Sequence, residues 1–417
     1  MTRQRRLCAR FYAFGLFAVV ALVAGQSTYA AGEISPALLA AHQLIGAQQS
    51  SGLFTFEHDF IPERKRLGTD SNIGRMAYVT REAAAVYGLS NYYLYDQDKG
   101  VARTLMAALR KLGALSVPIE KAPGQGAIEA TGILALPFGR YKLHDALQWL
   151  GLLYRPTGEG RLVSYDRTYE SAWAGATALS LLTELQFYRA SGDPRFTQLR
   201  QAWMKGLLVL YDSGRGFRIL PGSIDENALS NGEIWLALAS YSRLVVDDRA
   251  TASILARVDD YMMQTYAAAP NAEFYSWGTL AAAQRLKATS DVRFRRFIAQ
   301  QTRAYLGGIG PASGSSDNSC SAIEGLGTAL GVLTADKDQA LVRLLRRRIE
   351  DEMAKNRLLQ IQPGQTRVEF GGGTYLSSPL LADYAGAFLA GKYDPYVRID
   401  YTEHCISALL DLGERKH

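Results

Sequence analysis

Aromatic and acidic residues occur together in short segments at several places along this chain. One segment runs from Glu57 to Phe60, another from Glu273 to Trp277, and a third begins at Asp400. Aromatic rings offer flat apolar faces that can stack on the C–H faces of sugar rings, while carboxylates, amides and guanidinium groups bind hydroxyl and carboxylate groups. The combination indicates a surface that binds carbohydrate.

Hydrolysis of a glycosidic bond is the first chemistry that these residues could perform. It needs a carboxylic acid on one side of the scissile bond and a second carboxylate, acting as base or nucleophile, on the other. Glu57 lies among aromatic residues, a setting that suits a general acid. The candidates for the second carboxylate are Asp225, Glu226, Asp400 and Glu403. Any of them could instead be a helix N-cap or an ion-pair partner.

Abstraction of the C5 proton of a uronate, as in a lyase or an epimerase, is the alternative chemistry. It needs a Tyr or His base and a cation that neutralises the uronate carboxylate. The base candidates are Tyr401, His404 and His58, and the cation candidates are Arg75, Arg218 and Arg398.

Other residues of the same segments are expected to contact a sugar chain. They are His58, Asp59, Arg75, Tyr169, Trp173, Asn231, Tyr275, Trp277, Tyr375 and Arg398. The sequence has neither a nucleophile-elbow motif nor a phosphate-binding loop. It shows no ion site either, and we expect no cofactor and no metal.

Stretches rich in small apolar residues alternate with more polar stretches along the chain. The former cover 73–95, 170–191, 228–245, 276–288, 320–334 and 400–413, and the latter cover about 98–113, 194–212, 250–266, 292–306 and 339–358. Small residues allow helices to pack closely, and the polar stretches have the one-sided apolar pattern of half-exposed helices. Aspartates in the breaks between them, such as Asp98, Asp248 and Asp291, suit helix N-caps.

The spacing of these stretches predicts a closed ring. Asn231, Ser276 and Ser321 are 45 residues apart each time, and a constant period of this size indicates a helical repeat. We therefore expect an all-α fold, an (α/α)6 toroid of alternating inner and outer helices, rather than an open solenoid. Residues 33–50 or 380–391 would supply the sixth outer helix. Residues 120–168 are expected to form an insertion with β-hairpin character.

The connections of this ring differ at its two ends. Those leading from an outer to an inner helix are long and hold the aromatic and acidic residues, whereas the inner-to-outer connections are short and lack aromatics. In a toroid the long connections all open at one end, so we expect the functional site there.

Cys320 and Cys405 each lie in the first turns of a predicted inner helix. They could form a disulfide, remain unpaired and buried, or bind zinc together with His404. Zinc is the least favoured, because the adjacent His404 and Cys405 project about 100° apart on a helix. The sequence leaves the pairing of the two cysteines open.

In this architecture the chain resembles the six-hairpin (α/α)6-toroid superfamily, which includes glycoside hydrolases, polysaccharide lyases and uronyl C5-epimerases. The resemblance covers most of residues 31–417. The segment from Asp400 to His404 is similar to the Tyr- and His-bearing last helix of glucuronyl C5-epimerases. The resemblance implies a carbohydrate-active enzyme, and toroidal glycosidases commonly place two carboxylates at the entrances of different inner helices.

Residues 1–30 have the layout of a secretory signal peptide. Four arginines, all within the first ten residues, precede an apolar run from Phe11 to Gly25, and small residues then lead to an expected cleavage after Ala30. The run is short for a membrane span, which needs about 20 residues. Loss of these arginines reduces the formal net charge from +6 to +2, which weakens the case for a nucleic-acid partner.

We therefore expect a single domain over residues 31–417, in the periplasm or outside the cell. It would be a glycoside hydrolase that cleaves an envelope or extracellular polysaccharide with paired carboxylates. A uronate C5-epimerase or lyase, and a non-catalytic glycan-binding protein of an exopolysaccharide system, are the alternatives. The expected partners are a polysaccharide or oligosaccharide and a polysaccharide-secretion machinery, with no nucleic acid and no stable membrane span after signal cleavage.

Overall fold

The computed structural model describes most of residues 35–413. The described ranges are 35–55, 57–61, 72–123, 125, 143, 146–148, 150, 152–212, 216–221, 223, 225–245, 248–312, 314–334, 338–369 and 373–413, with the backbone alone for 72–77. Contacts divide the chain into Met1–Ser35 and Pro36–His417. The predicted signal peptide lies outside the described residues. Within the described ranges, no helix combines the length and the apolar character needed to cross a membrane.

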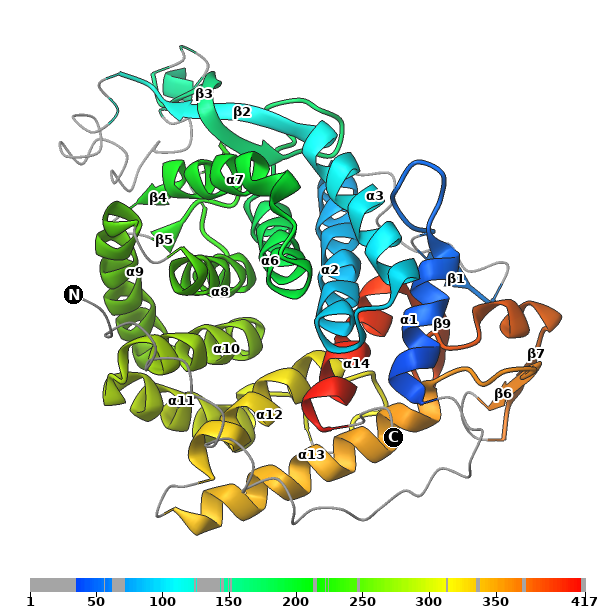
Figure 1. Ribbon diagram of the computed structural model, residues 1–417. Helices are drawn as coiled ribbons and strands as arrows, with labels where there is room; N and C mark the ends of the chain where they lie inside the picture. Colours follow the sequence, from blue (N-terminus) through cyan, green and yellow to red (C-terminus); the bar gives the residue numbers. More distant parts are fainter. Residues whose placement is uncertain are drawn as a thin grey trace, which may run out of the picture. The chain divides into compact units, whose positions relative to one another are not determined.

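Six of the described helices form an inner ring within Pro36–His417 (Figure 1). They are α2 (Asn72–Asp96), α6 (Ala174–Ser191), α8 (Ala228–Leu244), α10 (Ala272–Thr289), α12 (Cys320–Leu333) and α14 (Ile399–Asp411). Each packs against the next in this order, and α14 packs against α2. This last contact closes the ring, so the predicted toroid is confirmed and the open solenoid is excluded.

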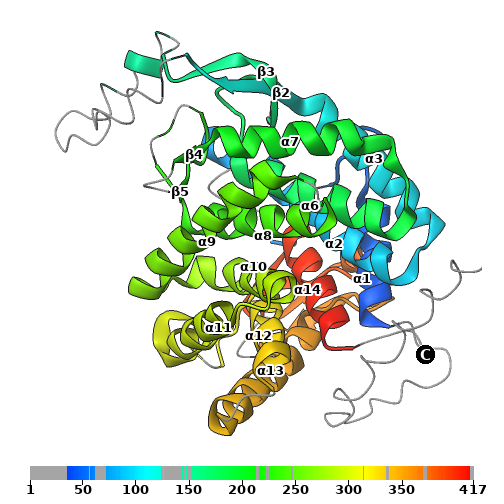
Figure 2. The ribbon, with the colours of Figure 1, turned by 60° about the vertical axis from the view of Figure 1, so that its left-hand side comes forward.

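Each inner helix has an outer helix packed against it (Figure 2). The outer helices are α1 (Pro36–Ala47), α3 (Lys99–Leu115), α7 (Thr197–Val209), α9 (Arg249–Ala268), α11 (Val292–Ala304) and α13 (Gln339–Leu359). Helix α1 packs against α14, α2 and α3, which makes it the sixth outer helix. The alternative that residues 380–391 take this place is wrong, because they hold most of the 3-10 helix η4 (Pro379–Tyr384) and strand β8 (Leu389–Gly391).

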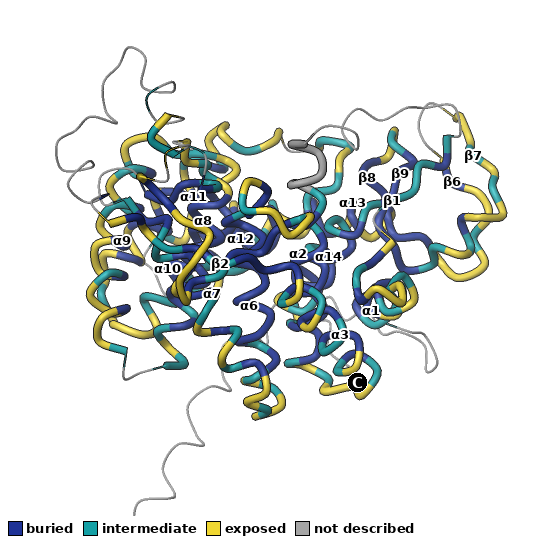
Figure 3. The backbone as a smooth tube through the Cα atoms, turned by 90° about the horizontal axis from the view of Figure 1, so that it is seen from above, coloured by how far each residue is buried: buried dark blue, intermediate teal, exposed yellow. Residues whose placement is uncertain are grey.

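The burial of the two helix classes follows from their sequences. The outer helix α3 buries Val101 and Leu105 and exposes Arg103 and Arg110, as a helix on a protein surface does. The inner helix α6 is buried on every side from residue 174 to residue 185. In Figure 3 the inner helices accordingly lie in the buried centre, with exposed residues around them.

The predicted N-caps are confirmed where outer helices begin. Asp98 accepts hydrogen bonds from the first backbone N–H groups of α3, Asp248 from α9, Asp291 from α11 and Asp338 from α13. Asp193 caps the short 3-10 helix η2 (Pro194–Phe196), which leads into α7. These bonds satisfy N–H groups that have no partner inside the helix.

Glycines determine how closely neighbouring inner helices approach. A Cβ on Gly232 of α8 would lie 2.7 Å from the Cβ of Trp277 on α10, and one on Gly325 of α12 would lie 2.8 Å from the Cα of Ser276. A Cβ on Gly88 of α2 would clash with the side chain of Glu403 on α14. The small residues expected for a tightly packed ring therefore lie at its helix–helix contacts.

The strands lie in connections that lead into inner helices, at one end of the ring. They are β1 (Glu57–Asp59), β2 (Ser116–Lys121), β3 (Tyr154–Val163), β4 (Tyr211–Asp212), β5 (Gly216–Phe217), β6 (Arg367–Glu369), β7 (Tyr375–Ser377), β8 and β9 (Asp394–Arg398). The pairs β2–β3, β4–β5 and β6–β7 are antiparallel, and β1, β9 and β8 form one antiparallel sheet in that order. The pair β2–β3 confirms a hairpin-like insertion, which begins at Ser116; residues 126–142 lie outside the description.

Cys320 and Cys405 form a disulfide between α12 and α14, with their Cα atoms 4.8 Å apart. The bridge closes a loop of 85 residues, and a loop of this size corresponds to about 4.6 kcal/mol of chain entropy removed from the unfolded state. It also rules out the zinc site that would use both thiolates. The first residue of α12 is thus covalently joined to the middle of α14.

Replacing Gly232 by alanine tests the close helix contacts. The added methyl group meets Trp277 across the α8–α10 contact, so we expect Gly232→Ala to lower the free energy of unfolding by about 1–3 kcal/mol. Gly331→Ala is the matched control, because Gly331 of α12 has open space around its Cβ position and a helical Gly-to-Ala change gains about 0.5–1 kcal/mol. Denaturant unfolding measures both, and equal stability of the two variants would contradict the packing argument.

Candidate functional site

The candidate site begins where strand pairing joins the first and last parts of the described chain. Glu57 of β1 pairs with Arg398 of β9 in antiparallel register. The Tyr396 hydroxyl donates a hydrogen bond to the Glu57 carboxylate. Because α14 follows β9 directly, Asp400 in its first turn lies close to the same strand pair. Candidates from opposite ends of the sequence are thereby brought together.

Two arginines hold the Asp400 carboxylate. Arg398 donates to it through Nε at 2.5 Å and Nη2 at 2.7 Å, and the Nε of Arg81 on α2 lies 3.6 Å from its Oδ2. The Arg398 guanidinium also lies over the Tyr401 ring, 4.3 Å from the centroid. The side chains of Arg81 and Asp400 keep 33% and 13% of their surface exposed. A ligand in solution can therefore reach this group.

Tyrosines border these charged residues. Tyr78 of α2 contacts Tyr165 edge to face with ring centroids 5.9 Å apart, and Tyr396 contacts Tyr401 in the same way at 6.4 Å. Burial raises the pKa of Tyr78 above its usual range, and the carboxylates of Glu82 and Glu57 raise it further. The Tyr78 hydroxyl is therefore a neutral hydrogen-bond donor near Glu57.

The side chain of His58 lies apart from this group. Successive residues of a strand point to opposite faces, and His58 stacks on Tyr384 at 4.9 Å and contacts Phe60 at 4.7 Å. Asp59 accepts a hydrogen bond from the backbone N–H of Ile61. These contacts place His58 in an aromatic cluster and do not include Glu57.

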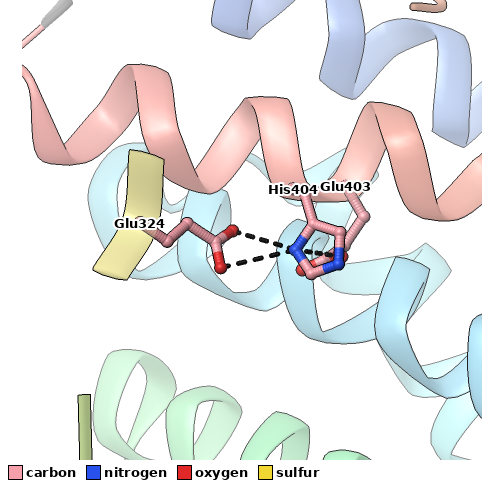
Figure 4. Close-up of side chains that lie close together, drawn as sticks. All are labelled: Glu324, Glu403 and His404. Carbon is pink, nitrogen blue, oxygen red and sulfur yellow. Dashed lines mark hydrogen bonds and ion pairs between the residues drawn. The ribbon is translucent and has the colours of Figure 1, made fainter. Parts of the chain in front are cut away.

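A second group lies deeper in the ring, one turn further along α14. The Nδ1 atom of His404 is 3.3 and 3.4 Å from the two carboxylate oxygens of Glu324 on α12, and 3.3 Å from Oε2 of Glu403. Figure 4 shows the imidazole facing both carboxylates. The Trp277 ring of α10 lies 5.9 Å from the imidazole. We call Glu324, Glu403 and His404 the floor cluster.

Burial and mutual charge control the protonation of the floor cluster. Burial alone would lower the pKa of His404, but the carboxylates of Glu403 and Glu324 outweigh it and raise this pKa to about 10. Burial raises the pKa of Glu324 and of Glu403, and the positive charge of His404 opposes both shifts. At neutral pH His404 is therefore an imidazolium. It keeps 18% of its side chain exposed, whereas both glutamates are almost fully buried.

Glu233 of α8 extends this buried acidic region. Its side chain packs against Gly175 of α6, and its Oε2 atom has no hydrogen-bond partner in the structure. Burial raises the pKa of Glu233 to about 8, against an opposing effect of His404. Glu233 is therefore mostly a neutral carboxylic acid at neutral pH.

The floor cluster is also the place where the described residues could hold a metal ion. One ligand atom from each of its three residues lies within 4.8 Å of the others. The chemistry of the donors suits a divalent transition metal. The high pKa of His404 means that a proton competes for its Nδ1 atom.

The remaining predicted residues are spread around the ring. Asp225 and Glu226 precede α8, which is three inner helices away from α14 in the ring, and Glu226 accepts hydrogen bonds from Asn231 and from the Tyr261 hydroxyl. Asn231 is buried and also accepts a hydrogen bond from the Phe217 backbone N–H. None of these contacts includes Glu57, Asp400 or the floor cluster.

Two of the predicted tyrosines have other surroundings. Tyr275 is fully buried and stacks on Tyr305 at 4.1 Å. Tyr375 is exposed, with the Arg367 guanidinium 3.6 Å from its ring centroid.

Tyr169 receives a 3.4 Å hydrogen bond from Gln148, and Trp173 stands at the N-cap position of α6. Arg218 is buried, 3.5 Å from Asp212. The side chain of Arg75 lies outside the description.

Sequence reasoning missed Glu324, Glu233 and Arg81. Glu324 is the only charged residue of α12, and Glu233 is the only acidic residue of α8. A lone carboxylate in an apolar inner helix could have signalled both, because burying a charge is costly without a partner. Nothing in the sequence distinguishes Arg81 from other helix-surface arginines.

Comparison with known proteins shows similarity in fold alone. No protein-family model and no curated protein matches the sequence. The GH76A α-1,6-mannanase from Salegentibacter sp. HEL1_6 superposes with a TM-score of 0.56 at 9% identity, over 91% of this chain and 98% of that chain. An inactive variant of that enzyme, with two adjacent aspartates replaced by alanine, in complex with α-1,6-mannotetrose gives a TM-score of 0.55 at 10% identity, over 91% and 98%.

A GH76 α-mannanase from Bacteroides thetaiotaomicron gives a TM-score of 0.56 at 8% identity, over 92% of this chain and 96% of that chain. Identities this low establish the shared fold only. The chain therefore shares the (α/α)6 toroid fold with these mannanases.

Replacing Glu324 by glutamine tests the floor cluster. The change removes one of the two carboxylates that face His404, so we expect the pKa of His404 to fall clearly below 10. NMR titration of the imidazole measures the pKa of His404. The signal of His404 is identified as the one that is missing from the spectrum of His404→Gln. Glu184→Gln is the control, because Glu184 is equally buried but pairs with Arg200 on α7. A His404 pKa that responds equally to both changes would contradict the assignment.

The raised pKa of Glu233 predicts a dependence of stability on pH. The folded state binds this proton more tightly than the unfolded state does, so the stabilisation is complete below the ordinary value of 4.5 and is lost as pH rises through about 8. We expect Glu233→Gln to match the parent protein at pH 5 and to exceed its free energy of unfolding by at least about 1 kcal/mol at pH 9. Denaturant unfolding at both pH values tests this. The control is the replacement of the exposed Glu273 by glutamine, which should leave the pH dependence of the free energy of unfolding unchanged. If Glu233→Gln shows the same pH dependence as the parent protein, the prediction is wrong.

Proposed function

We propose that this protein is a glycoside hydrolase that cleaves a polysaccharide with Glu57 and Asp400 as its acid–base pair. The observation that carries the proposal is the pairing of Glu57 with Arg398, which brings the Glu57 strand next to the first turn of α14. Two carboxylates in one accessible group are what glycosidic-bond hydrolysis requires. The fold shared with α-mannanases supports the same class of reaction.

The surroundings of the two carboxylates suggest separate roles. Asp400 lies in an ion pair with Arg398 and Arg81, and an ionised carboxylate is the form that a base needs to activate water. Glu57, whose carboxyl group accepts a hydrogen bond from the Tyr396 hydroxyl, takes the other role of the pair, the acid that protonates the leaving oxygen.

Other residues of the group are proposed to hold the substrate. Tyr401 and Tyr78 offer ring faces or edges for sugar stacking. His404 is partly exposed and positively charged, so it can donate a hydrogen bond to a sugar hydroxyl or carboxylate. His404 lies one turn further along α14 than Asp400, so we propose that the bound sugar extends from the acid–base pair toward His404.

We further propose that the protein is exported and meets its substrate in the periplasm or outside the cell. The basic start, the apolar run and the small residues up to Ala30 support a cleaved signal peptide. A disulfide between α12 and α14 is consistent with an oxidising compartment. A polysaccharide-secretion machinery remains the proposed partner on this basis.

Product analysis on a panel of polysaccharides tests the proposal. The panel includes an α-1,6-mannan, because α-1,6-mannotetrose is bound in one structure of similar fold, and several uronate polymers. We expect products that have gained the elements of water. Glu57→Gln and Asp400→Asn should each lower kcat by about a hundredfold or more. Glu273→Gln is the matched control, since Glu273 is an exposed carboxylate in the first turn of α10 at the same end of the ring.

The alternatives give different products. The Arg398 guanidinium lies over the Tyr401 ring, and His404 follows Asp400 by one turn of α14. A cation and a base for a uronate lyase or C5-epimerase are therefore present in Arg398 and Tyr401. An unsaturated uronate would indicate the lyase, and unchanged mass with deuterium uptake would indicate the epimerase. Glycan binding without turnover by any panel member would indicate the non-catalytic class. Full activity of Glu57→Gln and Asp400→Asn would overturn the acid–base assignment.

A further inference from the structure

A cleft of about 230 Å³ lies near the C-terminal ends of three consecutive inner helices, α6, α8 and α10. The strands and the candidate site lie at the N-terminal ends of these helices, so the cleft is at the other end of the ring. Its lining residues are Leu182, Leu185, Gln186, Arg189, Ser240, Arg243, Leu244 and Gln284. We call it the basal cleft.

Two arginines line the basal cleft, and a lysine lies on one of its helices. Arg189, Arg243 and Lys287 stand in the last turns of α6, α8 and α10. Within the described part of the chain, none of the three forms an ion pair with a carboxylate. Burial lowers the pKa of Lys287, and the positive charges of Arg243 and Arg189 lower it further, while Asp411 opposes them. Lys287 therefore lies close enough to both arginines for their charges to act on it.

Helix dipoles alone do not account for this arrangement. The C-terminal end of every helix favours a basic residue, and all six inner helices end on the same side of the ring. However, α2, α12 and α14 have no basic residue in their last turn. The basic residues occur in the three inner helices that line the cleft.

Polar groups in and beside the cleft orient its lining. Arg243 donates a 2.6 Å hydrogen bond to Gln284, which fixes its side chain toward α10. Gln186 donates a 3.2 Å hydrogen bond to Asn91 of α2. Three leucines supply an apolar wall. The cleft thus combines unneutralised guanidinium groups with hydroxyl, amide and apolar surface.

We propose that the basal cleft binds a small molecule that carries a carboxylate or a phosphate group. Guanidinium groups bind both of these oxyanions through paired N–H donors. Two of them facing one cleft suit a single oxyanion, and the leucines suit the apolar face of an attached ring. The volume is below the range of about 300–1,000 Å³ that is usual for larger ligands, so the proposal is limited to a group of monosaccharide size. This site is separate from the proposed hydrolase site.

Isothermal titration calorimetry on the signal-free chain at low ionic strength tests the proposal. The probes are inorganic phosphate, glucuronate and, as a neutral control, mannose. We expect the chain to bind phosphate or glucuronate but not mannose, and the response to the two anions distinguishes a phosphate ligand from a uronate one. Arg189→Gln and Arg243→Gln should each weaken anion binding at least about tenfold.

Arg303→Gln is the matched control, because Arg303 is an exposed arginine in the last turn of an outer helix. Ser240→Asp, which adds a negative charge inside the cleft, should also abolish binding. Circular dichroism and thermal unfolding confirm that each variant is folded. Failure of the parent chain to bind either anion, or equal weakening by Arg303→Gln, would overturn the proposal. Hydrolase activity in the Arg189 and Arg243 variants should be unchanged, so the two proposals fail independently.

Discussion

The contact between α14 and α2 is the constraint on which the rest of the structure depends. It joins the last inner helix to the first, and Gly88 allows the approach because any larger residue would clash with Glu403. Two further links hold α14 in place. The strand β9, which leads into α14, pairs with β1, and a disulfide joins Cys405 of α14 to Cys320 of α12. The candidate site lies at this closure: Arg81 and Glu57 come from the start of the chain, Asp400 and His404 from its end. An opened ring would retain its helices and lose the site.

The burial of the floor cluster destabilises the folded state. Two buried carboxylates repel each other and lose hydration, and each such loss is large unless a partner compensates. His404 supplies one positive charge to Glu324 and Glu403, so one of the two carboxyl groups is favoured in the neutral form. Glu233 adds a further neutral acid nearby. Strongly shifted groups of this kind concentrate at functional sites, which agrees with the position of the cluster behind the accessible Asp400.

The features that the sequence could predict are those with a local cause. The period of apolar residues and the aspartates before each outer helix depend on neighbours within a few turns, and the helices and caps were placed within a few residues on that basis. The aromatic and acidic content of the long connections likewise predicts the functional site at the end of the ring where these connections open, and the strands of the structure lie in the same connections. The ring could be inferred to close because the number of inner helices is itself visible in the sequence.

The features that sequence reasoning missed depend on contacts between distant residues. Tyr275 and Trp277 both belong to one aromatic segment, yet the helix turns the first toward Tyr305 and the second toward His404. Glu57 meets Arg398 only through the β1–β9 register. Glu324 matters because α12 lies beside α14, and no pattern within α12 specifies its neighbour. Side-chain direction and helix adjacency are set by the closed ring as a whole.

The common direction of the inner helices gives the two ends of the ring opposite electrostatic character. Their N-termini carry partial positive charge and favour the carboxylates that gather there, including Asp400 in the first turn of α14. This effect fades after the first turn, and it disfavours a cation, so the charge on His404 must be stabilised by Glu403 and Glu324 instead. At the opposite end the partial negative charge of the C-termini would repel an anion. A ligand with a carboxylate or phosphate group can be held there only if cations outnumber the local acids. Arg189, Arg243 and Lys287 supply three cations, and Asp411 is the carboxyl group that opposes the pKa shift of Lys287.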